Sequence, residues 1–155
     1  MPQSLSAVYI HLVFSTKERQ PFLRDESLRH DLHSFLGGTS KTLHCPTIIV
    51  GGVEDHVHLL SRFGRTITQA EWVKELKRVS NLWLKKQGVR DFEWQGGYAD
   101  FSVSASNLER VKMYIANQEG HSKRWDSRRS SANCLRGINL IGMKNISGSD
   151  ATASR

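Results

Sequence analysis

Cysteine is scarce in this chain of 155 residues, which has only two, Cys45 and Cys134. Their spacing is not that of a metal-binding motif, and so few cysteines are typical of a reducing cytoplasm rather than of a disulfide-stapled secreted domain. The chain also lacks any apolar run near the roughly 18 residues of a membrane helix, and any signal-peptide pattern at its N-terminus. We therefore expect a soluble, cytoplasmic protein without a membrane partner.

Acidic residues are outnumbered by basic ones, but the excess of positive charge lies mainly near the C-terminus. The net charge is +7. Residues 1–120 contain 15 Lys and Arg and 13 Asp and Glu, a net charge of +2, whereas residues 121–155 contain 7 and 2, a net charge of +5. The total charge is therefore weak evidence for nucleic-acid binding, and local groups of basic residues must carry that inference.

Strand-like and helix-like segments follow one another along the chain, and no internal repeat is visible. Their order is strand, helix, strand, strand, helix, strand, helix. This order predicts an α+β fold, a ferredoxin-like antiparallel β-sheet backed by helices. The predicted strands are 7–14, two within 47–60 that are broken by Gly51-Gly52 and have Glu54-Asp55 at their turn, and 101–104. The predicted helices are 25–36, ended by Gly37-Gly38, and two that begin with capping boxes at Thr68 and Ser106.

The helix that begins at Thr68 carries basic residues beside its apolar stripe. The stripe consists of Trp72, Leu76, Val79 and Trp83, and the basic residues are Lys74, Lys77, Arg78 and Lys85. Such a row of charges is about as often a solvated helix face as a surface that neutralises DNA phosphates. The loop at 94–98 is a second candidate, because Trp94 and Tyr98 could stack on unpaired bases. Aromatic residues in loops more often anchor the loop by packing, so both interpretations stay open.

Two histidines in the predicted strand after the Glu54-Asp55 turn are candidate metal ligands. Side chains alternate along a strand, so His56 and His58 project from one face while Val57 points to the other. Two imidazoles about 7 Å apart along a strand can share one metal ion. Taken alone, the pair is more often two ordinary histidines on a half-exposed strand.

The last predicted helix carries a tyrosine and a glutamine one turn apart, Tyr114 and Gln118. A tyrosine hydroxyl with a pKa near 10 is a poor nucleophile, but it can attack a phosphodiester that a metal polarises. Two imidazoles and an amide oxygen would leave metal positions open for phosphate and water, which suits Mg²⁺ or Mn²⁺. Zinc with Cys45 or His121 as a further ligand has no supporting spacing.

Four blocks of sequence together resemble the single-tyrosine HUH-endonuclease transposases, insertion-sequence-200-like and REP-associated. They lie in the order and spacing of that family and span about residues 6–121. The blocks are Tyr9-Ile10-His11-Leu12-Val13-Phe14-Ser15-Thr16-Lys17, Gly51-Gly52-Val53-Glu54-Asp55-His56-Val57-His58-Leu59-Leu60, Trp94-Gln95-Gly96-Gly97-Tyr98 with Phe101-Ser102-Val103-Ser104, and Tyr114-Ile115-Ala116-Asn117-Gln118-Glu119.

The resemblance implies an enzyme, a prokaryotic transposase that acts on DNA of the nucleoid. It implies that Tyr114 attacks single-stranded DNA and forms a 5′-phosphotyrosine link. It also implies that His56, His58 and Gln118 bind Mg²⁺ or Mn²⁺, that hairpins at the element's ends are recognised, and that the chain forms a homodimer. Family dimers often combine one subunit's histidine pair with the other subunit's tyrosine helix.

Two other functions remain open. A nickase for replication or plasmid transfer uses the same chemistry, but such proteins are usually larger and often carry two tyrosines. Here only Tyr114 has a glutamine one turn away. The other alternative is an inactivated or domesticated protein that binds hairpin DNA or RNA without cleaving it.

The C-terminal residues depart from the family pattern. Members usually carry two histidines where this chain has His121-Ser122, then a helix resembling Phe-x-Glu-Glu-Phe-x-x-Leu-Leu. Back-translation of this chain in a frame shifted by one nucleotide from Asp126 is compatible with that helix: Asn133/Cys134 must give Leu, and Met143/Lys144 must give Glu. We therefore expect residues 1–121 to be the catalytic domain and residues 122–155 to be a poorly ordered frameshift product that lowers activity. The alternative is a natural disordered tail.

Overall fold

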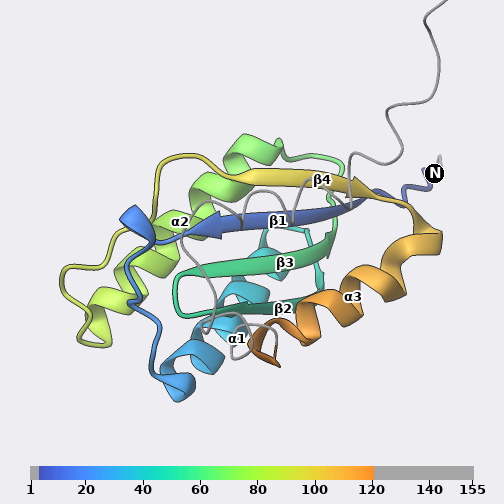
Figure 1. Ribbon diagram of the computed structural model, residues 1–155. Coiled ribbons are helices and arrows are strands. Elements are labelled where there is room, and N and C mark those ends of the chain that lie inside the picture. The colour runs from blue at the N-terminus through green and yellow to red at the C-terminus, as the bar shows by residue number, and fades with distance from the viewer. Residues whose placement is uncertain (1–3, 121–155) are drawn as a thin grey trace, which may run out of the picture. The chain divides into compact units, whose positions relative to one another are not determined.

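The computed structural model describes residues 4–120, and the predictions for residues 121–155 lie outside this range. The element order matches the prediction (Figure 1). Within residues 4–120, no helix is both long and apolar enough to span a membrane. The strands are β1 (Tyr9–Ser15), β2 (Thr47–Val53), β3 (His56–Arg62) and β4 (Ala99–Val103). The helices are η1 (Lys17–Arg19), α1 (Glu26–Thr42), α2 (Gln69–Lys86), η2 (Ala105–Asn107) and α3 (Leu108–Ala116).

The four strands form one antiparallel sheet in the order β2-β3-β1-β4. With α1 between β1 and β2 and α2 between β3 and β4, this is the predicted ferredoxin-like arrangement. Figure 1 shows α1 and α2 behind the sheet and α3 in front of it. The predicted α+β fold is therefore confirmed, with α3 as an additional helix on the second face.

The two faces of the sheet have different chemistry because successive side chains of a strand point in opposite directions. Leu12, Val57 and Leu59 pack in the larger core together with buried residues of α1 and α2. On the other face, Leu60 of β3 packs against Val111 and Ile115 of α3. The smaller apolar cluster thus leaves room on the second face for polar side chains.

Helix α1 is longer than predicted and runs through Gly37 and Gly38 to Thr42. A glycine in a helix interior costs about 1 kcal/mol, but packing continues past the pair and outweighs this cost. Ser40 is buried, accepts a hydrogen bond from Trp72 Nε1 at 2.9 Å and donates one to the carbonyl of Cys45 at 2.5 Å. The glycine pair was therefore wrong as a stop signal.

Two other local predictions need correction. Gly51 and Gly52 lie inside β2 rather than between two strands, although Glu54-Asp55 does form the predicted turn. Gly52 has a φ of 152°, and a Cβ there would lie 2.3 Å from the His56 carbonyl oxygen, so the hairpin requires glycine. The capping box at Ser106 is absent: η2 precedes α3, and Ser106 Oγ instead lies 3.1 Å from Ser104 Oγ.

Helix α2 begins as predicted, with a capping box between Thr68 and Glu71. Of the predicted stripe, Trp72 and Leu76 are buried, whereas Val79 and Trp83 are only half-buried. Val73, Ser80 and Leu84 complete the buried face of this helix.

Gly51 allows α3 to lie directly on β2. A Cβ at this position would lie 2.7 Å from Ile115 Cγ2 and 3.0 Å from the Ile115 carbonyl oxygen. We expect Gly51→Ala to lower the free energy of unfolding by about 1–3 kcal/mol, as overpacking does. The matched control is Gly38→Ala in α1, where an added Cβ meets no atom within 4 Å and should not destabilise. Urea denaturation measures both, and equal midpoints for the two variants would contradict this account of α3 docking.

Candidate active site

Strand β3 presents His56 and His58 side by side on the face that α3 covers. The centroids of their rings are 5.0 Å apart. Both side chains are buried, His56 at 7% and His58 at 1% exposure. The predicted placement on one face is confirmed, and the pair is not the half-exposed one that the alternative interpretation described.

Helix α3 brings Tyr114 to this pair within the same chain. The Tyr114 ring meets His58 edge-on, with centroids 5.8 Å apart and an interplanar angle of 82°. Gln118 follows the end of α3 and is buried at 8% exposure. The structure thus assembles the histidine pair and the tyrosine without a second subunit. The role of Gln118 as a metal ligand stays a prediction.

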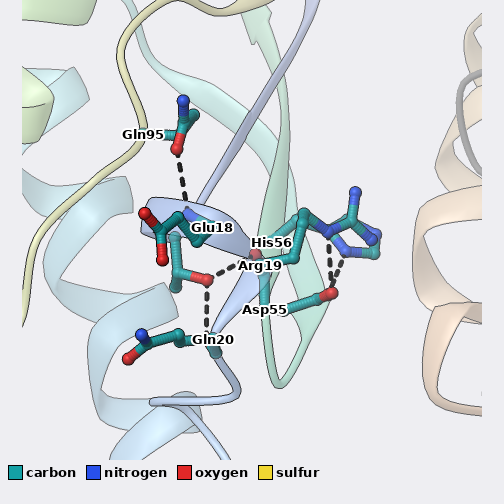
Figure 2. A network of polar contacts seen from close by, with 7 residues as sticks. Glu18, Arg19, Gln20, Asp55, His56 and Gln95 are labelled. Carbon is teal, nitrogen blue, oxygen red and sulfur yellow. Dashed lines mark hydrogen bonds and ion pairs between the residues drawn. The ribbon is translucent and has the colours of Figure 1, made fainter. Parts of the chain in front are cut away.

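His56 is oriented by the residue that precedes it. Its Nδ1 lies 2.6 Å from Asp55 Oδ1, and Asp55 Oδ2 accepts a hydrogen bond from Arg19 Nε at 2.8 Å (Figure 2). Burial raises the pKa of Asp55, but the hydrogen bonds and charges of His56 and Arg19 outweigh it and hold that pKa below its usual value. A carboxylate only accepts hydrogen bonds, so His56 Nδ1 carries a proton, and Nε2 is the nitrogen that can offer a lone pair to a ligand.

The turn that supplies Arg19 is a part of the site that sequence reasoning missed. Glu18 and Arg19 have φ values of 53° and 58°, which non-glycine residues rarely adopt. The turn is held because Glu18 N donates to Gln95 Oε1 at 3.0 Å (Figure 2). In addition, Thr16 Oγ1 donates to the Gln20 carbonyl at 2.6 Å, and Thr16 N donates to the Asp55 carbonyl at 2.9 Å. No propensity signals such a turn, since it depends on partners from distant segments.

His58 is oriented by another histidine, His11 of β1, which sequence reasoning placed only in an apolar strand. His11 Nε2 lies 2.9 Å from His58 Nδ1, and the two rings stack with centroids 5.1 Å apart. Burial lowers the pKa of His11 to about 4 and holds the pKa of His58 well below its usual value, helped by the charges of His56 and His11. His58 Nε2 is buried and has no hydrogen-bond partner within the part of the chain that the structure describes.

These features fit a divalent metal. Across residues 4–120, no group of three or more His, Cys, Asp or Glu side chains is placed so that it could hold a metal ion. The predicted ligand set consists of two histidines and the amide of Gln118, so it does not contain three residues of these types. The unpartnered His58 Nε2 and the carboxylate-bound His56 are what metal-ligating imidazoles require. Cys45 packs in the core on the opposite face, so it cannot complete a zinc site with the histidine pair. His121, the other residue considered for zinc, lies outside the described residues.

The predicted DNA-contacting residues differ in their availability. Lys77 donates to the carbonyls of Gln95 and Gly97 and lies over the Phe14 ring. Trp94 packs edge-on against Phe14 and donates from Nε1 to Ser80 Oγ at 2.9 Å. Both residues thus make packing or hydrogen-bonding contacts within the protein, and their role in DNA binding stays a prediction. Arg78 pairs with Glu75 at 2.8 Å, whereas Lys74, Lys85 and Tyr98 are exposed.

Helix α2, which carries these basic residues, packs on the face of the sheet opposite to the histidines. Phosphate contacts by Lys74 and Lys85 would therefore lie away from Tyr114. If the basic residues of α2 contact the DNA that Tyr114 cleaves, the DNA strand must pass around the edge of the sheet.

Comparison with solved structures places this fold among transposases. One similar structure, described as a candidate transposase from Deinococcus radiodurans R1, has a TM-score of 0.56 and 24% identity and covers 76% of this chain and 98% of its own. Another, a REP-associated tyrosine transposase bound to a REP hairpin, has a TM-score of 0.55 and 9% identity and covers 100% of this chain and 93% of its own. At these identities the likeness shows the fold alone. No curated protein matches the chain.

A family model gives the assignment that the structures alone do not. The model described as "Transposase IS200 like" matches residues 4–118. This range includes β1, the histidine pair, Tyr114 and Gln118, and it spans most of the chain. The protein therefore belongs to the IS200-like transposase family.

Proposed function

We propose that this transposase cleaves and rejoins single-stranded DNA through a covalent bond to Tyr114. The observation that carries the proposal is the position of Tyr114 beside His58, whose buried Nε2 has no hydrogen-bond partner among residues 4–120. A tyrosine next to two imidazoles that can bind a metal ion is an arrangement suited to attack on a metal-polarised phosphodiester.

In the proposed step, the Tyr114 hydroxyl gives up its proton and its oxygen attacks phosphorus. A tyrosine–phosphate bond forms, the bond to the 3′-oxygen breaks, and that oxygen leaves with a proton as a 3′-hydroxyl. The reverse attack by a 3′-hydroxyl rejoins the strand. His56, His58 and Gln118 would hold Mg²⁺ or Mn²⁺, and the bound cation would neutralise charge on the phosphate. The edge-on contact with His58 holds the tyrosine ring, which favours the geometry of attack.

The proposed substrate is single-stranded DNA that contains a hairpin. The structurally similar REP-associated transposase is bound to a REP hairpin, and the shared fold supports a related substrate here. Exposed Lys74, Lys85 and Tyr98 are candidates for phosphate contact and base stacking. Homodimer formation stays a prediction. The contact between Tyr114 and the histidine pair is made within one chain.

The test is an adduct assay on the full chain. Hairpin-bearing single strands and fully paired duplexes are incubated with Mn²⁺, and the products are separated under denaturing conditions. We expect a covalent protein–DNA adduct with single strands only, and its loss when EDTA removes the metal. Hairpin binding with no adduct under any condition would instead favour the non-catalytic binder.

Asp55 should matter to the metal through His56. We expect Asp55→Ala to weaken Mn²⁺ binding about 10- to 100-fold, the usual effect of removing the hydrogen-bond partner of a metal-ligating histidine. The matched control is Glu54→Ala in the same turn, because the Glu54 carboxylate points to Arg24 at 3.7 Å and not to a histidine. Free Mn²⁺ is measured by electron paramagnetic resonance, and equal affinities for the two variants would contradict this role.

A further inference from the structure

His11 is hydrogen-bonded to His58 but has no part in the proposed chemistry. His11 lies on β1, diagonally across from His58, because β1 and β3 pair Val13 with His58 and His11 with Leu60. Both rings are largely buried, at 8% and 1% exposure. Their nitrogens are 2.9 Å apart, which is the distance of a full hydrogen bond.

If both imidazoles are neutral, either His11 Nε2 or His58 Nδ1 carries the proton of this hydrogen bond. Which of them carries it determines whether His58 Nε2 has an N–H group or a lone pair. If His11 Nε2 carried it, His58 would be protonated at Nε2, and a buried N–H group would have no acceptor, at a cost of about 1–3 kcal/mol. If His58 Nδ1 carries it, the unpartnered Nε2 has a lone pair. A divalent cation satisfies that lone pair, so the second arrangement is consistent with a ligand.

We propose that His11 is a positioning residue that accepts a hydrogen bond from His58 Nδ1 and so directs the His58 Nε2 lone pair to a divalent cation. This rests on the proposed function. The two ligand histidines are then held by different partners, His56 by the Asp55 carboxylate and His58 by a neutral ring. A neutral acceptor orients His58 without adding a second buried anion where a DNA phosphate must approach.

A purely structural role for His11 makes a different prediction. Its ring also contacts Tyr114 edge-on, with centroids 6.2 Å apart, and Phe101 at 6.3 Å. If these packing contacts were its whole purpose, an apolar side chain of similar volume would serve as well as one that accepts a hydrogen bond.

The first test reads the proton position directly in the metal-free wild-type chain. Two-bond ¹H–¹⁵N correlation spectra distinguish imidazoles protonated at Nδ1 from those protonated at Nε2. We expect the Nδ1–H form for His58 and the Nδ1–H form for His11, whose Nε2 is the acceptor. An Nε2–H form of His58 would overturn the proposal without any variant.

The second test compares His11→Gln with His11→Leu by Mn²⁺ titration. The Gln carbonyl can replace the lost acceptor, so we expect an affinity within about threefold of wild type. Leu cannot, and we expect a loss of about tenfold or more. Thermal denaturation of both variants shows whether the fold is kept. Equal affinities for the two variants, or no Mn²⁺ binding by the wild type, overturn the proposal.

Failure here is separable from failure of the proposed function, because neither test uses DNA. Wild-type adduct formation with equal Mn²⁺ affinities for the two variants would reject the role of His11 and leave the function standing. A clear difference between Gln and Leu in a protein that forms no adduct would support the role of His11 and reject the function.

Discussion

Replacing Tyr114 by phenylalanine is expected to abolish the covalent adduct and to reduce strand cleavage by at least about a thousandfold, as the loss of a nucleophile typically does. The substitution removes one oxygen atom and keeps the ring that packs against His58 and His11. The free energy of unfolding and the Mn²⁺ affinity should therefore stay close to those of the wild type. Gel assays with end-labelled single strands measure the cleavage.

Tyr98→Phe is the matched control for this variant, because Tyr98 is exposed in the loop before β4. It should keep the adduct in full. An adduct that persists in Tyr114→Phe but disappears in Tyr98→Phe would show that the wrong tyrosine has been assigned.

Replacing His58 by leucine should have a comparable effect on cleavage through a different cause. Leucine fills much of the buried space of the ring but offers no lone pair, so a metal ligand is lost while packing against Tyr114 is largely kept. We expect cleavage to fall about 100-fold or more, in the range of lost transition-state stabilisation of 2.7–4 kcal/mol or above. Hairpin binding, measured by fluorescence anisotropy, should change little, because phosphate contacts dominate it.

The control for His58→Leu is His30→Ala, which removes an exposed histidine of α1. It should leave both cleavage and binding unchanged. Parallel losses of hairpin binding and cleavage in His58→Leu would contradict the separation of metal binding from DNA binding.

The sequence was sufficient for the fold because each element has a pattern that depends on its own residues. The apolar runs of β1 and β3, the capping box at Thr68 and the turn at Glu54-Asp55 are local signals, and the structure confirms them. The prediction that α1 ends at Gly37-Gly38 was wrong. The helix continues through Ser40, which is held by a hydrogen bond from Trp72, a residue distant in sequence.

The candidate site was predictable only in part, for the same reason. Residue type and spacing made the two histidines of β3 and Tyr114 candidates, and the resemblance to the transposase family gave them their predicted roles. Their orienting partners were not found, because His11 and Arg19 reach them across the sheet and from a turn with unusual φ values. The hydrogen bonds of Lys77 to the 94–98 loop could not be predicted either, because they depend on how that loop folds back.

The most direct measurement of the central claim is to map the adduct by mass spectrometry. The chain has three tyrosines, Tyr9, Tyr98 and Tyr114, and trypsin places each in a separate peptide. After digestion of the adduct with nuclease and trypsin, we predict a nucleotide mass on the peptide 113–123, attached to Tyr114 through a 5′-phosphate. A nucleotide on the peptide of Tyr9 or Tyr98, or on no tyrosine, would contradict the account.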